Sequence, residues 1–277
     1  MRTALITIVS GRHEHLRRQL DWVSRLDPEP HVHVVVSMGD PHIPDLVAAH
    51  GTGRGVVVMM DLTDELPLAA ARNQGVATAS ELGAEAVVLL DVDCLPDRDL
   101  LGDYERVLKH LESEPAVISG RVKYLPDGMT EADYTPARVA ELGRDHAARI
   151  VPQGSELVEA NPRMLWSLNI ASTVESWNRI GGFDEAYVGY GGEDTDFGQR
   201  LSAAGGSMWW SGRACAYHQY HPTVTPPVQH AVSIARNANL FRGKWGFDPM
   251  EGWLEQMLGT GHLEREGGQW RATDQRR

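Results

Sequence analysis

Cysteine and lysine are both scarce in this chain. Among its 277 residues the only cysteines are Cys94 and Cys215, which argues against a scaffold held by disulfides and fits a reducing compartment. Lysine occurs only at positions 109, 123 and 244, and the net charge is −12. A chain this acidic has little general affinity for nucleic acid or for an anionic membrane, because both repel it. We therefore expect no nucleic-acid partner.

Long apolar runs are also lacking. No stretch approaches the ~18–20 apolar residues that a membrane-spanning helix needs. The apolar run at residues 4–9 is too short for a secretory signal and is typical of a buried strand. We expect a cytoplasmic protein without a transmembrane segment, and peripheral contact with a membrane surface stays open. The hydrophobic content of 42% and the charged content of 23% are those of an ordinary globular protein.

Strand and helix patterns alternate through the first 90 residues. Apolar, β-branched runs predict strands, and helical spacing of apolar residues predicts helices. This βαβαβαβ order predicts an α/β fold with a mostly parallel central sheet and helices on both faces. Ligands of such sheets bind beyond the carboxyl ends of the strands. The expected strands are 5–10, 32–37, 55–60 and 86–90, and the expected helices are 13–25, 44–50 and 68–82.

The pattern is less regular after residue 100. Residues 121–165 give only one good helical signal, and the polar tail from about residue 263 is expected to fray. The glycines at 205 and 206 are expected to end a helix that begins in an acidic segment. The expected helices are 100–111, 136–150, 177–180 and 193–204, and the expected strands are 116–119, 164–171, 208–210 and 214–218.

Two aspartates follow the fourth expected strand. Asp91 and Asp93 come directly after the apolar run at 86–90, and alternate residues of a strand share a face. Two like charges this close are costly unless a cation lies near them. Carboxylate oxygens suit Mg²⁺ or Mn²⁺. The pattern predicts a divalent-metal site, and the alternative is a solvated strand end with two acids.

A glycine-rich acidic segment lies about 100 residues further on. Residues 180–185 read Ile-Gly-Gly-Phe-Asp-Glu, and residues 190–196 read Tyr-Gly-Gly-Glu-Asp-Thr-Asp. Glycine lets a ligand approach the backbone, and a helix N-terminus favours carboxylates. A simpler interpretation is that Asp194 and Asp196 cap the helix. Capping explains the acids but not the Gly-Gly-Phe-Asp-Glu block at its spacing.

Together the two motifs resemble the active-site halves of GT-A-type nucleotide-sugar glycosyltransferases, in the family 2 group with a galactosyltransferase-like C-terminal half. The resemblance spans about residues 1–222 and is strongest at 164–222. It implies a GT-A fold with a nucleotide-sugar-binding half at 1–120, an acceptor-binding and catalytic half of the same domain at 121–262, and a polar tail at 263–277. It also implies metal-dependent transfer of a hexose or amino-hexose from a UDP-sugar to a hydroxyl acceptor, carbohydrate or other, with inversion.

The resemblance also assigns roles on the acceptor side. Asp194 is similar to the base that takes the proton from the acceptor hydroxyl, and Glu193 would orient the acceptor. Tyr190, Gly191 and Gly192 would bind the acceptor. The family often has tryptophan where this chain has Tyr190.

On the metal side, the resemblance makes Asp93 a direct ligand of Mn²⁺ or Mg²⁺. Asp91 would contact the ribose or reach the metal through water. His218 follows the last core strand and would complete the metal site, since imidazole is a competent ligand for transition metals. His221 is the alternative ligand in the same segment.

On the donor side, Ser10 and Arg12 follow the first strand, where the family cradles the nucleotide. Arg72 and Asn73 lie in a segment similar to the family's Ala-Arg-Asn stretch, near the nucleotide. The alternative for Arg72 is a buried pair with an aspartate that holds its helix to the sheet. Asp40, after the second strand, is a candidate contact for the base.

Two other functions stay open. A nucleotidyltransferase of similar fold would need a glycine-rich basic loop after the first strand, and residues 10–13 contain one glycine. A non-catalytic sugar- or nucleotide-binding protein of this fold would be marked by loss of the acids. Here Asp91, Asp93, Glu193 and Asp194 are all present.

Overall fold

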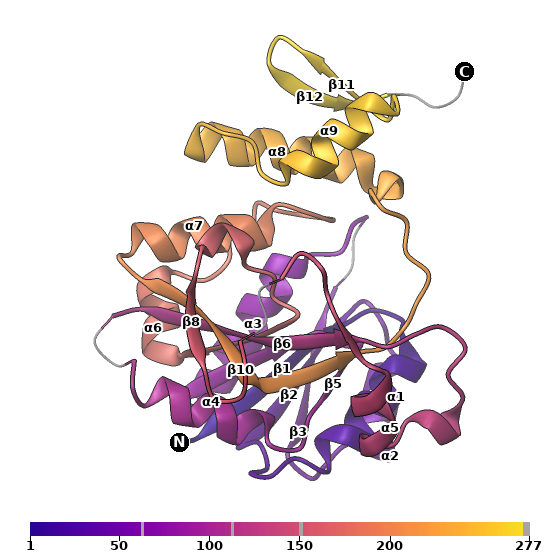
Figure 1. The fold of residues 1–277 in the computed structure, drawn as a ribbon, viewed down its shortest axis with the longest axis vertical. Helices are drawn as coiled ribbons and strands as arrows, with labels where there is room; N and C mark the ends of the chain where they lie inside the picture. The colour runs from indigo at the N-terminus through magenta and orange to yellow at the C-terminus, as the bar shows by residue number, and fades with distance from the viewer. Residues whose placement is uncertain (62–63, 112–113, 150–151, 274–277) are drawn as a thin grey trace.

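The N-terminal part of the chain is a parallel α/β unit, as predicted. The structure is a computed structural model that describes residues 1–61, 64–111, 114–149 and 152–273. Strand β1 pairs in parallel with β2 and β4, and β2 pairs in parallel with β3 (Figure 1). The elements are β1 (Thr3–Val9), α1 (His13–Val23), β2 (Val32–Met38), α2 (Ile43–His50), β3 (Gly55–Met60), α3 (Leu68–Glu81) and β4 (Ala86–Leu90).

The same sheet continues beyond β4 into the second half of the chain. Its ten strands follow the order β3-β2-β1-β4-β9-β6-β10-β5, with β7 beside β6 and β8 beside β10. Strand β9 is antiparallel to both β4 and β6, whereas β6 and β10 are parallel. The elements are β5 (Cys94–Pro96), α4 (Leu100–Leu108), β6 (Ala116–Tyr124), α5 (Pro136–Leu142), β7 (Arg144–Asp145), β8 (Leu157–Ala160), β9 (Asn169–Thr173), α6 (Val174–Ile180), α7 (Glu193–Ala203) and β10 (Ser207–His218), with 3₁₀ turns at Glu131–Asp133, Pro162–Met164 and Val228–His230.

Four of the predicted elements need correction. The helix expected at 136–150 ends at Leu142, because Gly143 has an extended backbone and leads into β7; residue 150 lies outside the described part. The strand expected at 164–171 starts only at residue 169, because a 3₁₀ turn begins at Pro162. The two strands expected near 208 and 218 form the single strand β10, whose register shifts between Ser211 and Cys215.

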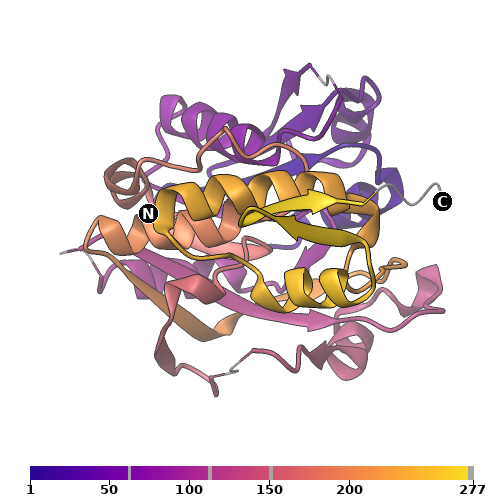
Figure 2. The same ribbon diagram turned by 90° about the horizontal axis from the view of Figure 1, so that it is seen from above.

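Residues 231–273 form a separate layer above the sheet. Figures 1 and 2 show helix α8 (Ala231–Trp245) lying over α7, with α9 (Glu251–Gly259) and the hairpin of β11 (Leu263–Glu266) and β12 (Gln269–Ala272) beside it. The expectation that the chain frays after residue 263 is therefore wrong for residues 263–273. Leu263 and Trp270 are buried in the apolar cluster of this layer, which also contains Ile234, Ala235, Ala238, Leu254 and Met257.

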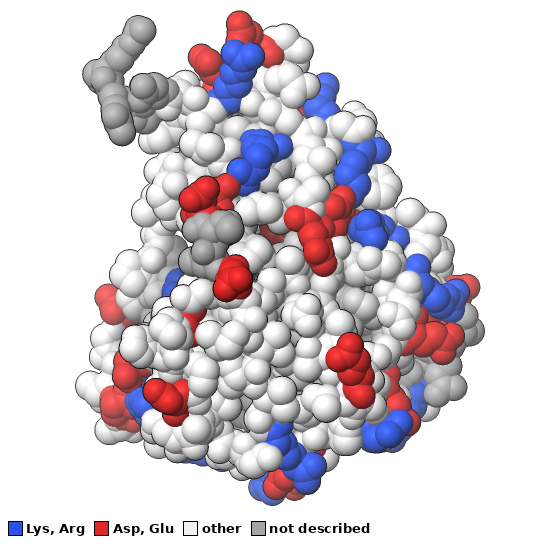
Figure 3. Space-filling view, turned by 180° about the vertical axis from the view of Figure 1, so that it is seen from behind, with Lys and Arg blue, Asp and Glu red and all other residues white. Residues whose placement is uncertain are grey.

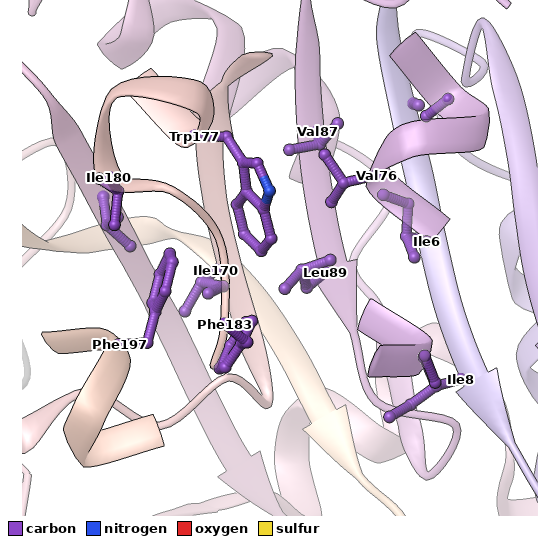
Figure 4. Close-up of a cluster of buried hydrophobic side chains, with 14 of the residues drawn as sticks. Ile6, Ile8, Val76, Val87, Leu89, Ile170, Trp177, Ile180, Phe183 and Phe197 are labelled. Carbon is purple, nitrogen blue, oxygen red and sulfur yellow. The ribbon is translucent and has the colours of Figure 1, made fainter. Parts of the chain in front are cut away.

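The largest core cluster fixes α6 and α7 to the sheet. Figure 4 shows Trp177, Phe183 and Phe197 gathered next to Ile170 of β9. The rings of Phe183 and Phe197 stack with centroids 4.4 Å apart, and Trp177 lies 5.0 Å from Phe197. Aromatic groups of this size contribute much of the energy of a core. The acidic N-terminus of α7 is thereby held in a defined place over the sheet.

The charged side chains on the surface include both acids and bases. On the face shown in Figure 3, acidic and basic side chains are interspersed, and the described residues there form no continuous basic area. None of the described helices combines the length and apolar character that crossing a bilayer requires.

Helix α7 approaches the 3₁₀ turn at Pro162 so closely that only glycine fits at position 198. A Cβ there would lie 2.0 Å from the Pro162 carbonyl oxygen, and a backbone atom cannot move aside as a side chain can. We expect Gly198→Ala to destabilise the protein by ~1–3 kcal/mol, as overpacked cores do, and to lower its melting temperature. Gly243→Ala in α8 is the control, since a Cβ there meets nothing within 4 Å. Equal melting temperatures of the two variants would contradict the prediction.

Candidate active site

Three side chains of the metal-binding type converge at the carboxyl end of β4. One ligand atom from each of Asp93, His218 and His221 lies within 4.8 Å of the others. Asp93 Oδ1 is 3.5 Å from His218 Nε2, and Asp93 Oδ2 is 3.3 Å from His221 Nε2. The pairing of β10 with β5 places His218 opposite Cys94, the neighbour of Asp93. The sequence left open which histidine belongs to the site, and the structure brings both to it.

The surroundings favour the charged form of Asp93 and the neutral form of His218. Burial by itself would raise the Asp93 pKa, but the hydrogen bond from His221 and the charges of His218, His221 and Arg12 lower it to about 2. Arg12 Nη1 lies 3.8 Å from Asp93 Oδ2. Burial lowers the pKa of His218, whose ring stacks on Tyr124 with centroids 4.7 Å apart. A carboxylate with two imidazoles is a donor set that suits Mn²⁺.

A buried guanidinium connects β4 to the acidic start of α7. Arg72 of α3 is 5% exposed, and its Nη2 lies 3.6 Å from Asp91 Oδ1. Its Nη1 lies 3.5 Å from Glu193 Oε1 and 3.9 Å from Asp194 Oδ1. Burial raises the pKa of Asp91 to about 6. Burial, with the neighbouring charge of Asp194, raises the pKa of Glu193 to about 7. One cation thus faces three carboxylates.

Asp194 has one oxygen that faces Arg72 at 3.9 Å but accepts no hydrogen bond from the described residues. Its Oδ2 accepts a hydrogen bond of 3.0 Å from the Ser167 backbone N–H. Its Oδ1 is buried and has no hydrogen-bond partner among the described residues. A carboxylate that is oriented by one bond and has an unused oxygen is suited to accept a proton from a ligand.

The loop of residues 190–192 is held by Asn237 of α8 and by His230, which precedes that helix. Gly191 and Gly192 have φ angles of +92° and +95°, which favour glycine. Asn237 of α8 donates to the Gly191 carbonyl oxygen at 2.8 Å. The Tyr190 ring stacks with His230 at a centroid distance of 4.7 Å. The sequence analysis missed Asn237, because nothing in the sequence near it signals a partner 46 residues earlier.

Asn73 follows Arg72 in α3 and holds the Gly-Gly-Phe-Asp-Glu loop in place. Its Nδ2 donates to the Phe183 carbonyl oxygen at 2.9 Å and to Glu185 Oε1 at 2.8 Å. Its Oδ1 accepts from the Phe183 N–H at 2.9 Å. Both of its N–H groups are therefore engaged within the protein. The prediction that Asn73 binds the donor stays untested, and the geometry shows a residue that positions the loop.

Asp40 fastens the turn that follows β1. Ser10 follows the strand and is half buried, and the turn continues through Gly11, whose N–H donates to Asp40 Oδ2 at 3.0 Å. His42 N–H donates to Oδ1 at 3.0 Å, and His13 Nε2 lies 2.7 Å from Oδ2. Although burial opposes it, these bonds lower the Asp40 pKa. The carboxylate is therefore largely occupied, and its predicted contact with a base stays a prediction.

Known protein sequences are similar to parts of this chain, including the segment that carries Glu193, Asp194 and His218. Residues 160–222 match the family model described as the N-terminal domain of galactosyltransferase. The chain is similar to the chondroitin synthase of Pasteurella multocida (strain Pm70), with 28% identity over 177 residues, covering 56% of this chain and 18% of that protein. It is also similar to the validoxylamine A glucosyltransferase of Streptomyces hygroscopicus subsp. jinggangensis, with 48% identity over 40 residues, covering 14% of this chain and 10% of that protein. The chain thus spans less than a fifth of the length of these curated relatives.

Comparison with solved structures confirms the predicted fold. GalNAc-T7 with UDP, GalNAc and Mn²⁺ superposes with a TM-score of 0.61 at 14% identity, covering 87% of this chain and 50% of that one. Residues 1–349 of S. aureus TarS in complex with UDP superpose with a TM-score of 0.60 at 14% identity, covering 94% of this chain and 72% of that one. The chain has the GT-A fold, as its sequence motifs predicted.

The raised pKa of Glu193 predicts a stability that depends on pH. Because folding raises this pKa from 4.5 to about 7, the folded state binds more protons than the unfolded state between these values. Stability is therefore lost as the pH rises through this window. We expect Glu193→Gln to raise the melting temperature at pH 8, measured in EDTA, and the difference from the original protein to shrink toward pH 5.

The control for this prediction is Glu255→Gln on the exposed surface of α9, which should shift the melting temperature little at either pH. An effect of Glu193→Gln that is the same at pH 5 and pH 8 would contradict the prediction.

Proposed function

We propose that this chain is a metal-dependent, inverting glycosyltransferase that moves a hexose or amino-hexose from a UDP-sugar to a hydroxyl acceptor. The observation that carries the proposal is the position of two groups at one end of the sheet. The ligand-type cluster of Asp93, His218 and His221 lies after β4, and Arg72 contacts both Asp91, two residues before Asp93, and the Asp194 oxygen that accepts no hydrogen bond. Metal binding and proton transfer are the two tasks that such a reaction needs.

The donor side has residues that fit a divalent cation and a diphosphate. The single carboxylate and two imidazoles fit Mn²⁺, with Mg²⁺ the weaker match because it prefers oxygen ligands. A bound divalent ion would supply neutralisation of the charge that grows on the departing diphosphate. Arg12 is 37% exposed and adds a positive charge beside Asp93. Asp40 would support this side indirectly by fixing the turn before Arg12. The UDP and Mn²⁺ in the GalNAc-T7 structure support the proposal.

The acceptor side has the residues for a single displacement. The acceptor oxygen would attack the anomeric carbon while the bond from that carbon to the diphosphate oxygen breaks, which inverts the configuration. Asp194 would take the acceptor proton on its free Oδ1, and the Ser167 N–H holds the carboxylate in place. Glu193, Tyr190 and the two glycines after it would orient the acceptor. General base catalysis is typically worth ~10²–10⁴ in rate.

A non-catalytic sugar- or nucleotide-binding protein remains the main alternative, and a nucleotidyltransferase is the second. The presence of the free Asp194 oxygen favours an enzyme over a binding protein. Two assays separate the three functions. One measures UDP release from a panel of UDP-sugars with and without Mn²⁺, and the other measures pyrophosphate release from a nucleoside triphosphate. Steady release of UDP supports the proposal, binding without turnover supports the binding protein, and release of pyrophosphate from a nucleoside triphosphate supports the nucleotidyltransferase.

We expect UDP binding to require a divalent ion, with Mn²⁺ at least as effective as Mg²⁺. Calorimetry in excess EDTA should show a loss of UDP affinity of at least about tenfold, since the charge of the diphosphate would be uncompensated. Asp93→Ala should remove the metal-dependent part of the UDP affinity. Asp91→Ala should lower the UDP affinity less, because Asp91 faces Arg72. The exposed Asp99→Ala is the control. Unchanged UDP affinity in EDTA would rule out the metal assignment.

We expect Asp194→Asn to reduce kcat by ~10²–10⁴ while UDP affinity changes less than about twofold. The amide keeps the shape of the side chain and its bond from Ser167, but it cannot take up the acceptor proton. Asp99→Asn should leave kcat unchanged. A variant that kept more than about a tenth of the original rate would mean that another group is the base.

A further inference from the structure

A buried glutamine holds the turn that carries Asp93. After β4 the chain makes a tight turn in which the Cys94 N–H donates to the Asp91 carbonyl oxygen at 2.8 Å. The side chain of Gln19, from helix α1, bonds to both ends of this turn. Its Nε2 donates to the Asp91 carbonyl oxygen at 2.8 Å and to the Cys94 carbonyl oxygen at 2.9 Å. Gln19 has no exposed surface, so it acts on the backbone around Asp93 and not on a ligand.

Gln19 occupies a helix position that packing alone would give to an apolar residue. Leu16 and Leu20, its neighbours on the same face of α1, are fully buried in a cluster with Val9 and Val35 of the sheet. An amide buried among such side chains costs free energy unless its donors and its acceptor are bonded. Both N–H groups of Gln19 bond to the turn, a contact that leucine or methionine in its place cannot make.

Two further buried side chains set the orientation of the Gln19 amide. Carbonyl oxygens only accept hydrogen bonds, so Gln19 must present its nitrogen to the turn and its Oε1 to Thr7 of β1. The Thr7 hydroxyl donates its single hydrogen to this Oε1 at 2.9 Å. The Thr7 oxygen then accepts from Nε2 of His33 in β2, 3.1 Å away. Burial lowers the pKa of His33 to about 4, so its ring is neutral at pH 7 and has its one N–H at Nε2.

The histidine side of the cluster is bonded to the same helix. Gln219, next to His218, is fully buried, and its backbone N–H donates to the Asp93 carbonyl oxygen at 2.7 Å. Its side-chain Nε2 donates to the His15 carbonyl oxygen of α1 at 3.1 Å. Helix α1 is thus bonded through one glutamine to the turn of Asp93 and through the other to the segment of His218 and His221. It therefore contributes to the distance between the carboxylate and the two imidazoles.

We infer that Gln19 is a positioning residue of the proposed metal site. By bonding to both ends of the turn it holds the Asp93 carboxylate at its distance from the two histidines. The relay from His33 through Thr7 keeps the Gln19 amide in the orientation that this task requires. The inference rests on the proposed function, because it concerns the same metal site. Partners that orient a metal ligand are typically worth about 10-fold to 100-fold in metal affinity.

The test is the Mn²⁺ affinity of Gln19→Met. The electron paramagnetic resonance signal of free Mn²⁺ measures it, with the metal alone and with UDP against a protein-free blank. Methionine is similar to glutamine in length but has no amide, so the turn loses both bonds while every candidate ligand stays. We expect the Mn²⁺ affinity to fall about 10-fold. UDP affinity in EDTA should equal that of the original protein, because the change acts through the metal site. An unchanged Mn²⁺ affinity would overturn the inference.

The pair Thr7→Val and Thr7→Ser tests the relay, and it decides the question if Gln19→Met does not fold. Valine is similar to threonine in size but has no hydroxyl, so Oε1 of Gln19 loses its donor and the Mn²⁺ affinity should fall. Serine keeps the hydroxyl and should keep the original affinity. Equal Mn²⁺ affinities of the two variants would contradict the relay.

Ser172→Ala is the control for a general loss of stability. The Ser172 hydroxyl donates to the Ala116 carbonyl oxygen at 2.9 Å, so this variant also loses a buried hydrogen bond. Ser172 lies opposite Val87, near the start of β4, whereas the turn follows the end of that strand. The control should keep the original Mn²⁺ affinity whatever its melting temperature. A fall as large as that of Gln19→Met would show an effect of stability alone and overturn the inference.

A spectroscopic measurement checks the direction of the relay. Long-range proton–nitrogen correlation spectra of the original protein at pH 7, assigned through backbone connectivities, should show the ring proton of His33 on Nε2. A proton on Nδ1 would reverse the order of donors and contradict the relay.

Two outcomes distinguish this inference from the proposed function. Failure of the original protein to bind Mn²⁺, with or without UDP, would contradict the metal assignment of the proposed function and the inference with it. Mn²⁺ binding that Gln19→Met leaves unchanged would contradict only the role of Gln19.

Discussion

The contact of Arg72 with three carboxylates is the interaction on which the site depends. It joins the end of β4, through Asp91, to the start of α7, through Glu193 and Asp194. Burial, with repulsion from neighbouring carboxylates, raises the pKa values of Asp91 and Glu193 although the charge of Arg72 opposes it. The site therefore has an excess of negative charge next to Asp93. A cation bound there would lower the free energy of the whole cluster, so that metal binding and the stability of the site are coupled.

The C-terminal layer holds the other side of α7. Asp196 is fully buried and accepts hydrogen bonds from Tyr187 Oη at 3.2 Å and from Trp245 Nε1 at 2.7 Å. Lys244 Nζ lies 2.6 Å from the same oxygen. Because Lys244 and Trp245 belong to α8, the helix that carries Glu193 and Asp194 is fixed between the sheet and α8. An active-site helix held from both sides keeps its carboxylates in place without help from a ligand.

The sequence predicted what depends on local periodicity and on motifs. The βαβ order of the first 90 residues is confirmed, because buried strands and amphipathic helices leave a repeating pattern. The GT-A fold, which the resemblance of the two acidic motifs implied, is confirmed as well. The partners of Asn73 and Asn237 could not be predicted, since they lie 110 and 46 residues away in the sequence. The hairpin after residue 263 was missed for a related reason: Leu263 and Trp270 are its two buried residues in a polar segment, and they are buried by packing against α8 and α9.

Three arginines of this region differ in how many partners the described residues give them. Arg72 faces three carboxylates of the chain and has a structural use whether or not a ligand is bound. Arg12 has one longer contact with Asp93 and is partly open to solvent. Arg149 donates to the Ser119 hydroxyl oxygen and stacks on Trp166, and it forms no salt bridge with any described residue. Of the three, Arg12 is the one that lies beside the acidic cluster and is also open to solvent, so in a chain of net charge −12 it offers positive charge where the surrounding charge is negative.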